Sequence, residues 1–178
     1  PKTRTEAVVG LSRALESVGE YDKALEAVEA ALKDAPKEPA LLARQAELLY
    51  LRGRWDDAEK AANAAIDASR PEELPHFRAR WVRAQIYRDR GNVADADKEF
   101  RWFVRTYTER SNKDDDIKDP EELLLVGQAG SENARWHNLS NQFRFILQTL
   151  YVDAEKEANK VKEPLWQAEY QAGALLLE

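Results

Sequence analysis

Two segments of this chain carry the same pattern of glycine, aromatic and alanine residues at a spacing of 34 residues. The first, VGEYDKALEAVEAALKDAP, covers residues 18–36, and the second, RGRWDDAEKAANAAIDASRP, covers residues 52–71. Four positions keep their type while almost everything between them changes: Gly19, Tyr21, Ala24 and Ala31 become Gly53, Trp55, Ala58 and Ala65. A fixed period of this length indicates a repeated supersecondary unit whose neighbours stack on one another.

The segments between the breaks have the composition and spacing of helices. All seven prolines fall where breaks between helices are expected, since proline is strongly unfavourable inside a helix. Between them, apolar residues recur every three or four positions, and no segment keeps the period-two alternation of a strand. We therefore expect an all-α fold with helices at residues 4–17, 21–34, 39–51, 55–68, 73–90, 93–109, 120–133, 137–157 and 164–177.

Small residues recur at the places where two paired helices must come close. Glycines can take the positive φ that closes a tight turn, and the sequence places them between paired helices at Gly19, Gly53 and Gly91. Five residues later an alanine lets the second helix approach the first, at Ala24, Ala58 and Ala96. A second column of small residues lies on the first helix of each pair, at Ser12, Ala46, Ala84, Gly127 and Gly173. These columns predict the contact points of stacked helical hairpins.

This combination of period, turn glycine, aromatic and small-residue columns resembles the tetratricopeptide repeat. The resemblance implies a right-handed α-solenoid of helix-turn-helix repeats in one domain over residues 1–178. The repeats would span about 5–38, 39–72, 77–110 and 120–160, with a fifth beginning at 164–178. The third repeat departs from the pattern because Phe103 stands where the second alanine belongs. The chain starts at Pro1 and stops after the first helix of the fifth repeat, so we expect it to be part of a longer protein.

Composition and net charge limit the classes of partner that the chain is expected to bind. The formal net charge of −6 argues against nucleic acid, because phosphate binding needs a dominant basic face. No apolar run is long enough to span a membrane. The chain has no cysteine, so thiol chemistry neither supplies a metal site nor indicates a compartment.

Motifs for catalysis are missing from the sequence. His76 and His137 lie far apart and outside any H-E-x-x-H pattern, and no phosphate-binding or nucleophile loop is present. Three consecutive aspartates at residues 114–116 leave two interpretations open, a cation site or an ordinary acidic loop. The EF-hand pattern is not met there, because its required glycine is missing. We expect no enzymatic activity, no cofactor, no bound metal and no small-molecule substrate.

Seven arginines gather near aromatic residues in the third repeat: Arg78, Arg80, Arg83, Arg88, Arg90, Arg101 and Arg105. Such a cluster could grip phosphates and stack bases. Alternatively, the arginines cover apolar surface with their stems and pair with Asp89, Asp95 and Asp97. The acidic balance of the whole chain favours the second interpretation.

The resemblance implies that the first helix of each repeat lines a concave groove for a peptide or partner helix. Carried over residue by residue, the groove positions are Val9, Arg13, Ala43, Glu47, Tyr50, Trp81, Gln85, Arg88, Leu124 and Gln128. An apolar row flanked by polar groups suits a peptide. The alternative for the apolar row is packing between neighbouring helices. The carboxylate clamp of chaperone-binding members is absent, because its lysine and asparagine positions hold other residues.

The sequence thus favours a non-catalytic protein-interaction scaffold. One alternative is an accessory N-terminal region of a larger enzyme, such as a metallopeptidase, since some bacterial repeat proteins with a similar fourth repeat continue into such a domain. A further alternative is a repeat protein that binds nucleic acid. The unpaired last helix, with Leu175, Leu176 and Leu177, suggests self-association through its apolar surface.

Overall fold

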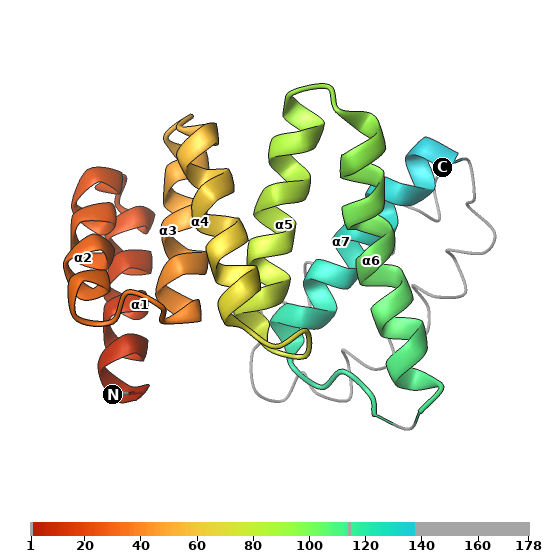
Figure 1. The fold of residues 1–178 in the computed structure, drawn as a ribbon, viewed down its shortest axis with the longest axis horizontal. Helices are drawn as coiled ribbons and strands as arrows, with labels where there is room; N and C mark the ends of the chain where they lie inside the picture. Colours follow the sequence, from red (N-terminus) through yellow and green to blue (C-terminus); the bar gives the residue numbers. More distant parts are fainter. Residues whose placement is uncertain (1, 114, 138–178) are drawn as a thin grey trace. The chain divides into compact units, whose positions relative to one another are not determined.

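The computed structural model describes residues 2–113 and 115–137, and these form α-helices joined by short connections (Figure 1). The helices are α1 (Lys2–Ser17), α2 (Tyr21–Asp34), α3 (Pro39–Leu51), α4 (Trp55–Ala68), α5 (Leu74–Asp89), α6 (Val93–Ser111) and α7 (Pro120–His137). The expected all-α fold is confirmed, and the first six expected helices match to within two residues at each end. The helices expected at 137–157 and 164–177 lie outside the described residues, apart from His137.

The seventh helix differs from expectation at its end. It was expected to stop at residue 133, but α7 continues to His137. The reason is local: residues 131–137 contain neither glycine nor proline, so nothing in the chain interrupts the helical hydrogen bonds there. The predicted break between 133 and 137 is therefore wrong.

The three turns within helix pairs share one geometry. Gly19, Gly53 and Gly91 have φ values of 80°, 72° and 75°, the left-handed conformation that glycine adopts without strain. In each turn, the residue after the glycine donates its N–H to a carbonyl five residues back, at 2.8–2.9 Å. This closure satisfies carbonyls at the end of the helix and confirms the predicted role of the glycines.

Two compact units divide the chain, Pro1–Ala96 and Asp97–Glu178. In the first, here called unit 1, each helix contacts the next along the chain from α1 to α5. The first helices of successive pairs also contact one another, α1 with α3 and α3 with α5. A continuous repeat solenoid through residue 178 stays a prediction.

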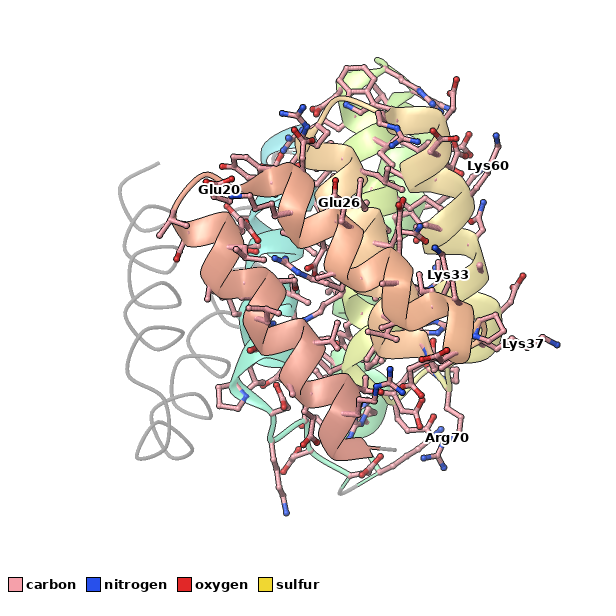
Figure 2. All side chains as sticks on the ribbon, turned by 90° about the vertical axis from the view of Figure 1, so that its left-hand side faces the viewer. Glu20, Glu26, Lys33, Lys37, Lys60 and Arg70 are labelled. Atoms are coloured by element: carbon pink, nitrogen blue, oxygen red, sulfur yellow. The ribbon has the colours of Figure 1, made fainter. Side chains whose placement is uncertain are left out.

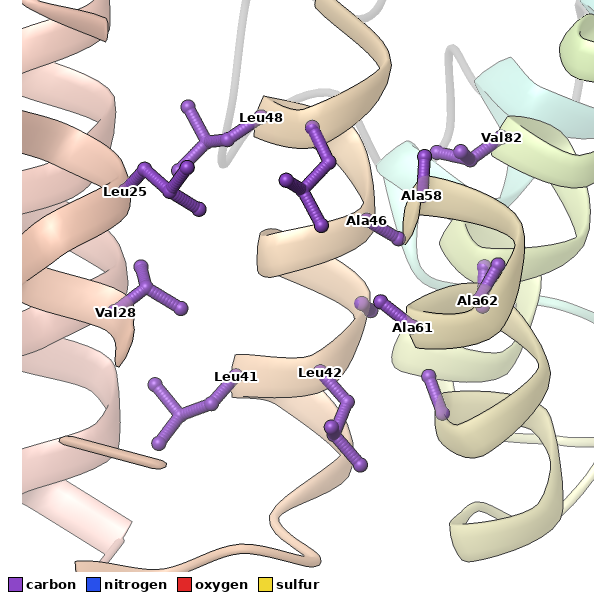
Figure 3. Packing of buried hydrophobic residues seen from close by; sticks show 14 of the residues in the cluster. Leu25, Val28, Leu41, Leu42, Ala46, Leu48, Ala58, Ala61, Ala62 and Val82 are labelled. Carbon is purple, nitrogen blue, oxygen red and sulfur yellow. The ribbon is translucent and has the colours of Figure 1, made fainter. Parts of the chain in front are cut away.

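The core of unit 1 lies between successive helices (Figure 3). Leu25 and Val28 of α2 face Leu41 and Leu48 of α3, and the next layer is filled mainly by alanines of α4. The small-residue columns are fully buried at Ser12, Ala24, Ala46, Ala58, Ala84 and Ala96. A larger side chain at these positions would push neighbouring helices apart, which explains why they stay small.

The outer sides of α2 and α4 in unit 1 carry charged residues. Figure 2 shows Glu26 and Lys33 of α2 and Lys60 of α4 projecting away from the ribbon. These second helices therefore have an apolar side toward the core and a charged side toward water, the pattern of a helix that covers one face of a core.

In the second unit, the described part of α6 and α7 is joined by polar contacts. Asn133 Nδ2 donates to Asp97 Oδ1 at 2.7 Å. Arg110 Nε donates to the carbonyl oxygen of Asp115 at 3.0 Å, and its Nη1 lies 3.7 Å from Glu122 Oε2. Burial, followed by the charge of Asp119, raises the pKa of Glu122 to about 7. The bulky Phe103 is fully buried and meets Trp102 edge to face, with ring centroids 5.2 Å apart.

Candidate partner-binding surface

Eight of the ten residues predicted to face a partner lie on α1, α3 and α5 in unit 1. Residues three and seven positions apart share one side of a helix, so Glu47 aligns with Tyr50 and Trp81 aligns with Arg88. Since α1 contacts α3 and α3 contacts α5, these stripes lie on neighbouring helices. We call the accessible members of this set the inner face: Arg13, Glu47, Tyr50, Trp81 and Arg88.

The other predicted positions differ in exposure. Ala43 is only 1% exposed and belongs to the hydrophobic core, and Gln85 is 6% exposed. Val9 is half-buried and packs against the same core. Leu124 and Gln128 are partly exposed on α7, in the second unit. Val9 and Ala43 of the apolar row therefore pack between neighbouring helices, which was the alternative interpretation. The polar residues Arg13, Glu47 and Arg88 keep accessible surface.

A buried arginine lies beneath the inner face. Arg44 of α3 is 4% exposed, and its Nε donates to Ser12 Oγ of α1 at 2.8 Å. One terminal nitrogen donates to Glu47 Oε2 at 2.8 Å, and the other pairs with Glu16 of α1. All three arms of the guanidinium are therefore used to fix α1 against α3, which raises the pKa of Arg44 against the opposing effect of burial.

Sequence reasoning missed this role of Arg44. Its equivalents one repeat away, at the spacings of the small-residue columns, are Gly10 and Val82. The sequence did contain a signal for this role, because Arg44 stands at a position that is apolar or small in the other repeats. Such a residue needs partners when it is buried, because an unpaired buried charge is strongly unfavourable.

The network continues from α3 to α5. Glu47 Oε1 lies 3.9 Å from Arg78 Nε, so one carboxylate lies between arginines of two helices. Burial raises the pKa of Glu47, and the charge of Arg44 counteracts that rise. At the end of the two helices, Tyr50 donates its hydroxyl to Asp89 Oδ2 at 2.6 Å. Arg88 Nε donates to the other oxygen of Asp89 at 3.1 Å.

Asp89 contacts both Tyr50 and Arg88 and so holds their side chains close together. Partial burial and the Asp89 carboxylate raise the pKa of Tyr50 to about 12, so the phenol stays a hydrogen-bond donor at neutral pH. The Arg88 side chain keeps 35% of its surface exposed. The expected side-by-side arrangement of the α3 and α5 stripes is therefore present at this end.

The arginines of the third repeat pair with neighbouring polar side chains, as the second of the two interpretations predicted. Each has a polar partner: Arg78 with Glu47, Arg80 with His76, Arg83 with Asn63, Arg88 with Asp89, Arg90 with Asp56 and Glu59, Arg101 with Asp97, and Arg105 with Glu109. Asp95 accepts a hydrogen bond from Asn92 Nδ2 at 2.7 Å. These contacts neutralise much of the basic cluster.

His76 is buried in a hydrogen-bonded chain. Arg80 Nε donates to His76 Nε2 at 3.0 Å, so Nε2 is the unprotonated nitrogen and Nδ1–H faces Ser69 Oγ at 3.1 Å. Ser69 Oγ in turn donates to the carbonyl oxygen of Ala65 at 2.6 Å. Burial and the charges of Arg80 and Arg83 lower the pKa of His76 to about 4. The side chain is therefore neutral and structural near pH 7.

Metal-binding clusters and membrane-spanning helices are both absent from the described residues. No cluster of histidine and carboxylate side chains in this part of the chain could hold a metal ion. Asp115, in the acidic segment, instead pairs with Arg110 at 3.1 Å. Across residues 2–113 and 115–137, no helix combines the length and apolarity of a membrane span.

Comparison with known proteins agrees with the geometry. Residues 9–73, from the middle of α1 to the segment after α4, match the family model described as tetratricopeptide repeat. No curated protein matches the chain. The matched segment contains the two turns with the 34-residue spacing and the buried alanines of the first two hairpins. Proteins built from these repeats are generally protein-interaction modules. On this match and the helical-hairpin architecture, residues 9–73 are identified as tetratricopeptide repeats.

Proposed function

We propose that this chain is a non-catalytic scaffold that binds an extended peptide or a partner helix on the inner face. The observation that carries the proposal is the contact of Tyr50 with Asp89, which also pairs with Arg88. This contact joins the stripes of α3 and α5 into one surface. The match of residues 9–73 to tetratricopeptide repeats supports a protein partner in general.

The side-chain chemistry of the inner face suits a protein ligand. Tryptophan, tyrosine and arginine are the residue types that most often dominate binding energy at interfaces. Trp81, Tyr50 and Arg88 are all partly exposed here, so a ligand can still bury their remaining surface. The ion pairs beneath them hold α1, α3 and α5 in register, so little ordering free energy is lost when a ligand binds.

The charges on this face indicate an acidic side chain in the ligand. Arg13 is exposed on α1 and Arg88 is partly exposed on α5, at separate places along the stripe. A carboxylate of a bound peptide can pair with a guanidinium through two parallel hydrogen bonds. Glu47 lies between arginines and disfavours a second carboxylate near the middle of the face.

Selection from a phage-displayed library of random linear peptides tests this proposal. Peptides enriched on the wild-type chain are titrated against the wild type, Arg88→Glu and Lys33→Glu. Lys33 is an exposed residue on the outer side of α2, so Lys33→Glu makes the same charge change away from the inner face. We expect Arg88→Glu to weaken binding at least tenfold at low salt and less at high salt, with Lys33→Glu near the wild type.

Two results would contradict the proposal. Either no peptide is enriched on the folded wild-type chain, or the enriched peptides bind Arg88→Glu as tightly as they bind the wild type. The second result would place peptide binding on another surface.

A further inference from the structure

A cavity of about 370 Å³ lies between the first turns of α1, the end of α2 and the start of α3, all in unit 1. Its volume falls within the range of sites that hold small ligands. The apolar residues of the lining are Val8, Ala31, Ala35 and Leu41. The polar residues of the lining are Arg4, Thr5, Asp34 and Glu38. We call this space the α1–α3 cavity.

The corresponding place in the second hairpin is filled by side chains. At the spacings of the small-residue columns, Ala35 corresponds to Ser69 and Glu38 corresponds to His76. Ser69 Oγ lies 3.1 Å from His76 Nδ1, and His76 is only 4% exposed. Since Ser69 is the C-cap of α4 and His76 lies on α5, no helix that precedes the hairpin is needed to close this place. Residues 35 and 38 therefore explain the α1–α3 cavity, whatever precedes α1.

The unbalanced charge in the cavity lining is that of Glu38. Arg4 Nη2 donates to Asp34 Oδ2 at 2.7 Å, so these two opposite charges offset each other. Glu38 stands at the N-cap of α3, but its side chain makes no capping hydrogen bond. Among the described residues, its carboxylate forms no hydrogen bond or ion pair with another side chain, although the residue is half-buried. A positively charged group in the cavity would supply the missing partner.

Helix ends contribute weaker charges to the same place. The N-termini of α1 and α3 each carry about half a positive charge, and the C-terminus of α2 carries about half a negative charge. Together they amount to about half a positive charge, which is smaller than the full negative charge of Glu38. The cavity therefore favours a cation over an anion.

We propose that the α1–α3 cavity binds an alkylammonium group, with the hydrocarbon chain against the apolar lining and the nitrogen beside the Glu38 carboxylate. Leu41, which is 1% exposed and points toward α2 in Figure 3, provides apolar surface for the chain. The ammonium gains a charge-assisted hydrogen bond. A lysine side chain of another protein and a free aliphatic amine both carry this group. No lining residue belongs to the inner face, so the proposal does not depend on peptide binding there.

Titration of the whole chain with n-hexylammonium, followed by NMR spectra of the backbone amides, tests the proposal. Hexanol and hexanoate carry the same hydrocarbon chain with a neutral or a negative head group. We expect n-hexylammonium to bind about tenfold more tightly than hexanoate, because only the cation is attracted by Glu38. The shifted signals should belong to the cavity lining, at residues 4–8, 31–35 and 38–41.

Two variants separate the effect of charge from the effect of shape. Glu38→Gln keeps the size of the side chain and removes no capping bond, so it should bind n-hexylammonium no more tightly than hexanol. Ala35→Leu places a larger side chain in the cavity and should abolish the binding of all three probes. Glu26→Gln makes the same charge change on the outer side of α2, and this control should bind as the wild type does.

A blocked pentapeptide with one central lysine distinguishes the two sources of the group. If it binds at least as tightly as n-hexylammonium, the natural occupant is a lysine of another protein. If only the free amine binds, the natural occupant is a small aliphatic amine. Both results support an ammonium site.

Four results would overturn the proposal. They are no binding by any probe, hexanoate binding as tightly as n-hexylammonium, an unchanged preference for the cation in Glu38→Gln, and wild-type binding by Ala35→Leu. Shifted signals that lie only outside the cavity lining would count as the first of these.

Discussion

At the scale of single residues, Arg44 joins the core of unit 1 to its inner face. Its guanidinium is almost completely buried and bonds Ser12, Glu16 and Glu47 on two helices. A buried ion pair adds little stability compared with apolar packing, but removing one partner leaves the other charge without compensation. Arg44 therefore matters most for the alignment of α1 with α3.

Arg44→Met should lower the free energy of unfolding by about 3 kcal/mol, because it leaves two carboxylates without the cation that they share. The double variant Arg44→Met/Glu47→Gln should recover part of the loss, since it removes one of those carboxylates. Urea denaturation measures both. Arg54→Met is the control: Arg54 pairs with Asp57 on the surface, where solvent screens the ion pair and it contributes little stability. Equal, small losses for Arg44→Met and Arg54→Met would contradict the structural role.

His76 should make stability depend on pH. Its pKa is about 4 in the folded chain and near 6.5 when unfolded, so between these values the unfolded state binds more protons. The contribution of His76 to the free energy of unfolding is therefore fully present above pH 6.5. It is lost as the pH falls to 4, and the loss amounts to about 3 kcal/mol at most. His76→Gln, which cannot titrate, should remove this dependence. The difference in unfolding free energy between the two proteins, measured from pH 4 to 8, isolates His76 from groups such as Glu122. A difference that does not change with pH would contradict the assignment.

At the scale of elements, the helical hairpin is specified by its turn. The three turns have the same positive-φ glycine and the same backbone closure, although the helices around them differ in sequence. An L-residue with a Cβ is strained in this conformation by about 1–2 kcal/mol.

Gly53→Ala should therefore destabilise unit 1 by about 1 kcal/mol, although open space surrounds Gly53. Gly53→Asn should cost less, because asparagine adopts the left-handed conformation more readily. Thermal unfolding of the two variants distinguishes backbone strain from side-chain crowding. If the larger asparagine were the more harmful of the two, strain would not be the cause.

Most of this element-level architecture could be predicted because its determinants are local. Prolines, turn glycines and small-residue columns each act within a few residues, so the order and bounds of α1–α6 follow from the pattern. The end of α7 was missed because its determinant was the absence of a helix breaker rather than the presence of one.

The candidate surface was less predictable from sequence. The repeat pattern predicts which side of a helix a residue occupies, but the exposure of that residue depends on the neighbouring helix. Ala43 is buried in the core, whereas Tyr50 keeps accessible surface. The contact of Tyr50 with Asp89 depends on how α3 and α5 pack, so periodicity alone does not reveal it.

At the scale of the whole molecule, the inner face of unit 1 is the surface that we propose for a partner. It combines aromatic and charged residues above a fixed ion-pair network, which suits a peptide or partner helix.

Titration of an enriched peptide against Trp81→Ala, together with thermal melts, tests the central claim most directly. If the inner face is the binding surface, Trp81→Ala should weaken binding by about 2 kcal/mol, roughly 30-fold, while its melting midpoint stays close to that of the wild type. If Trp81 is instead a core residue, the variant should lose about 3–5 kcal/mol of stability and melt far lower. A low-melting Trp81→Ala protein together with normal peptide binding by Arg88→Glu would contradict the account.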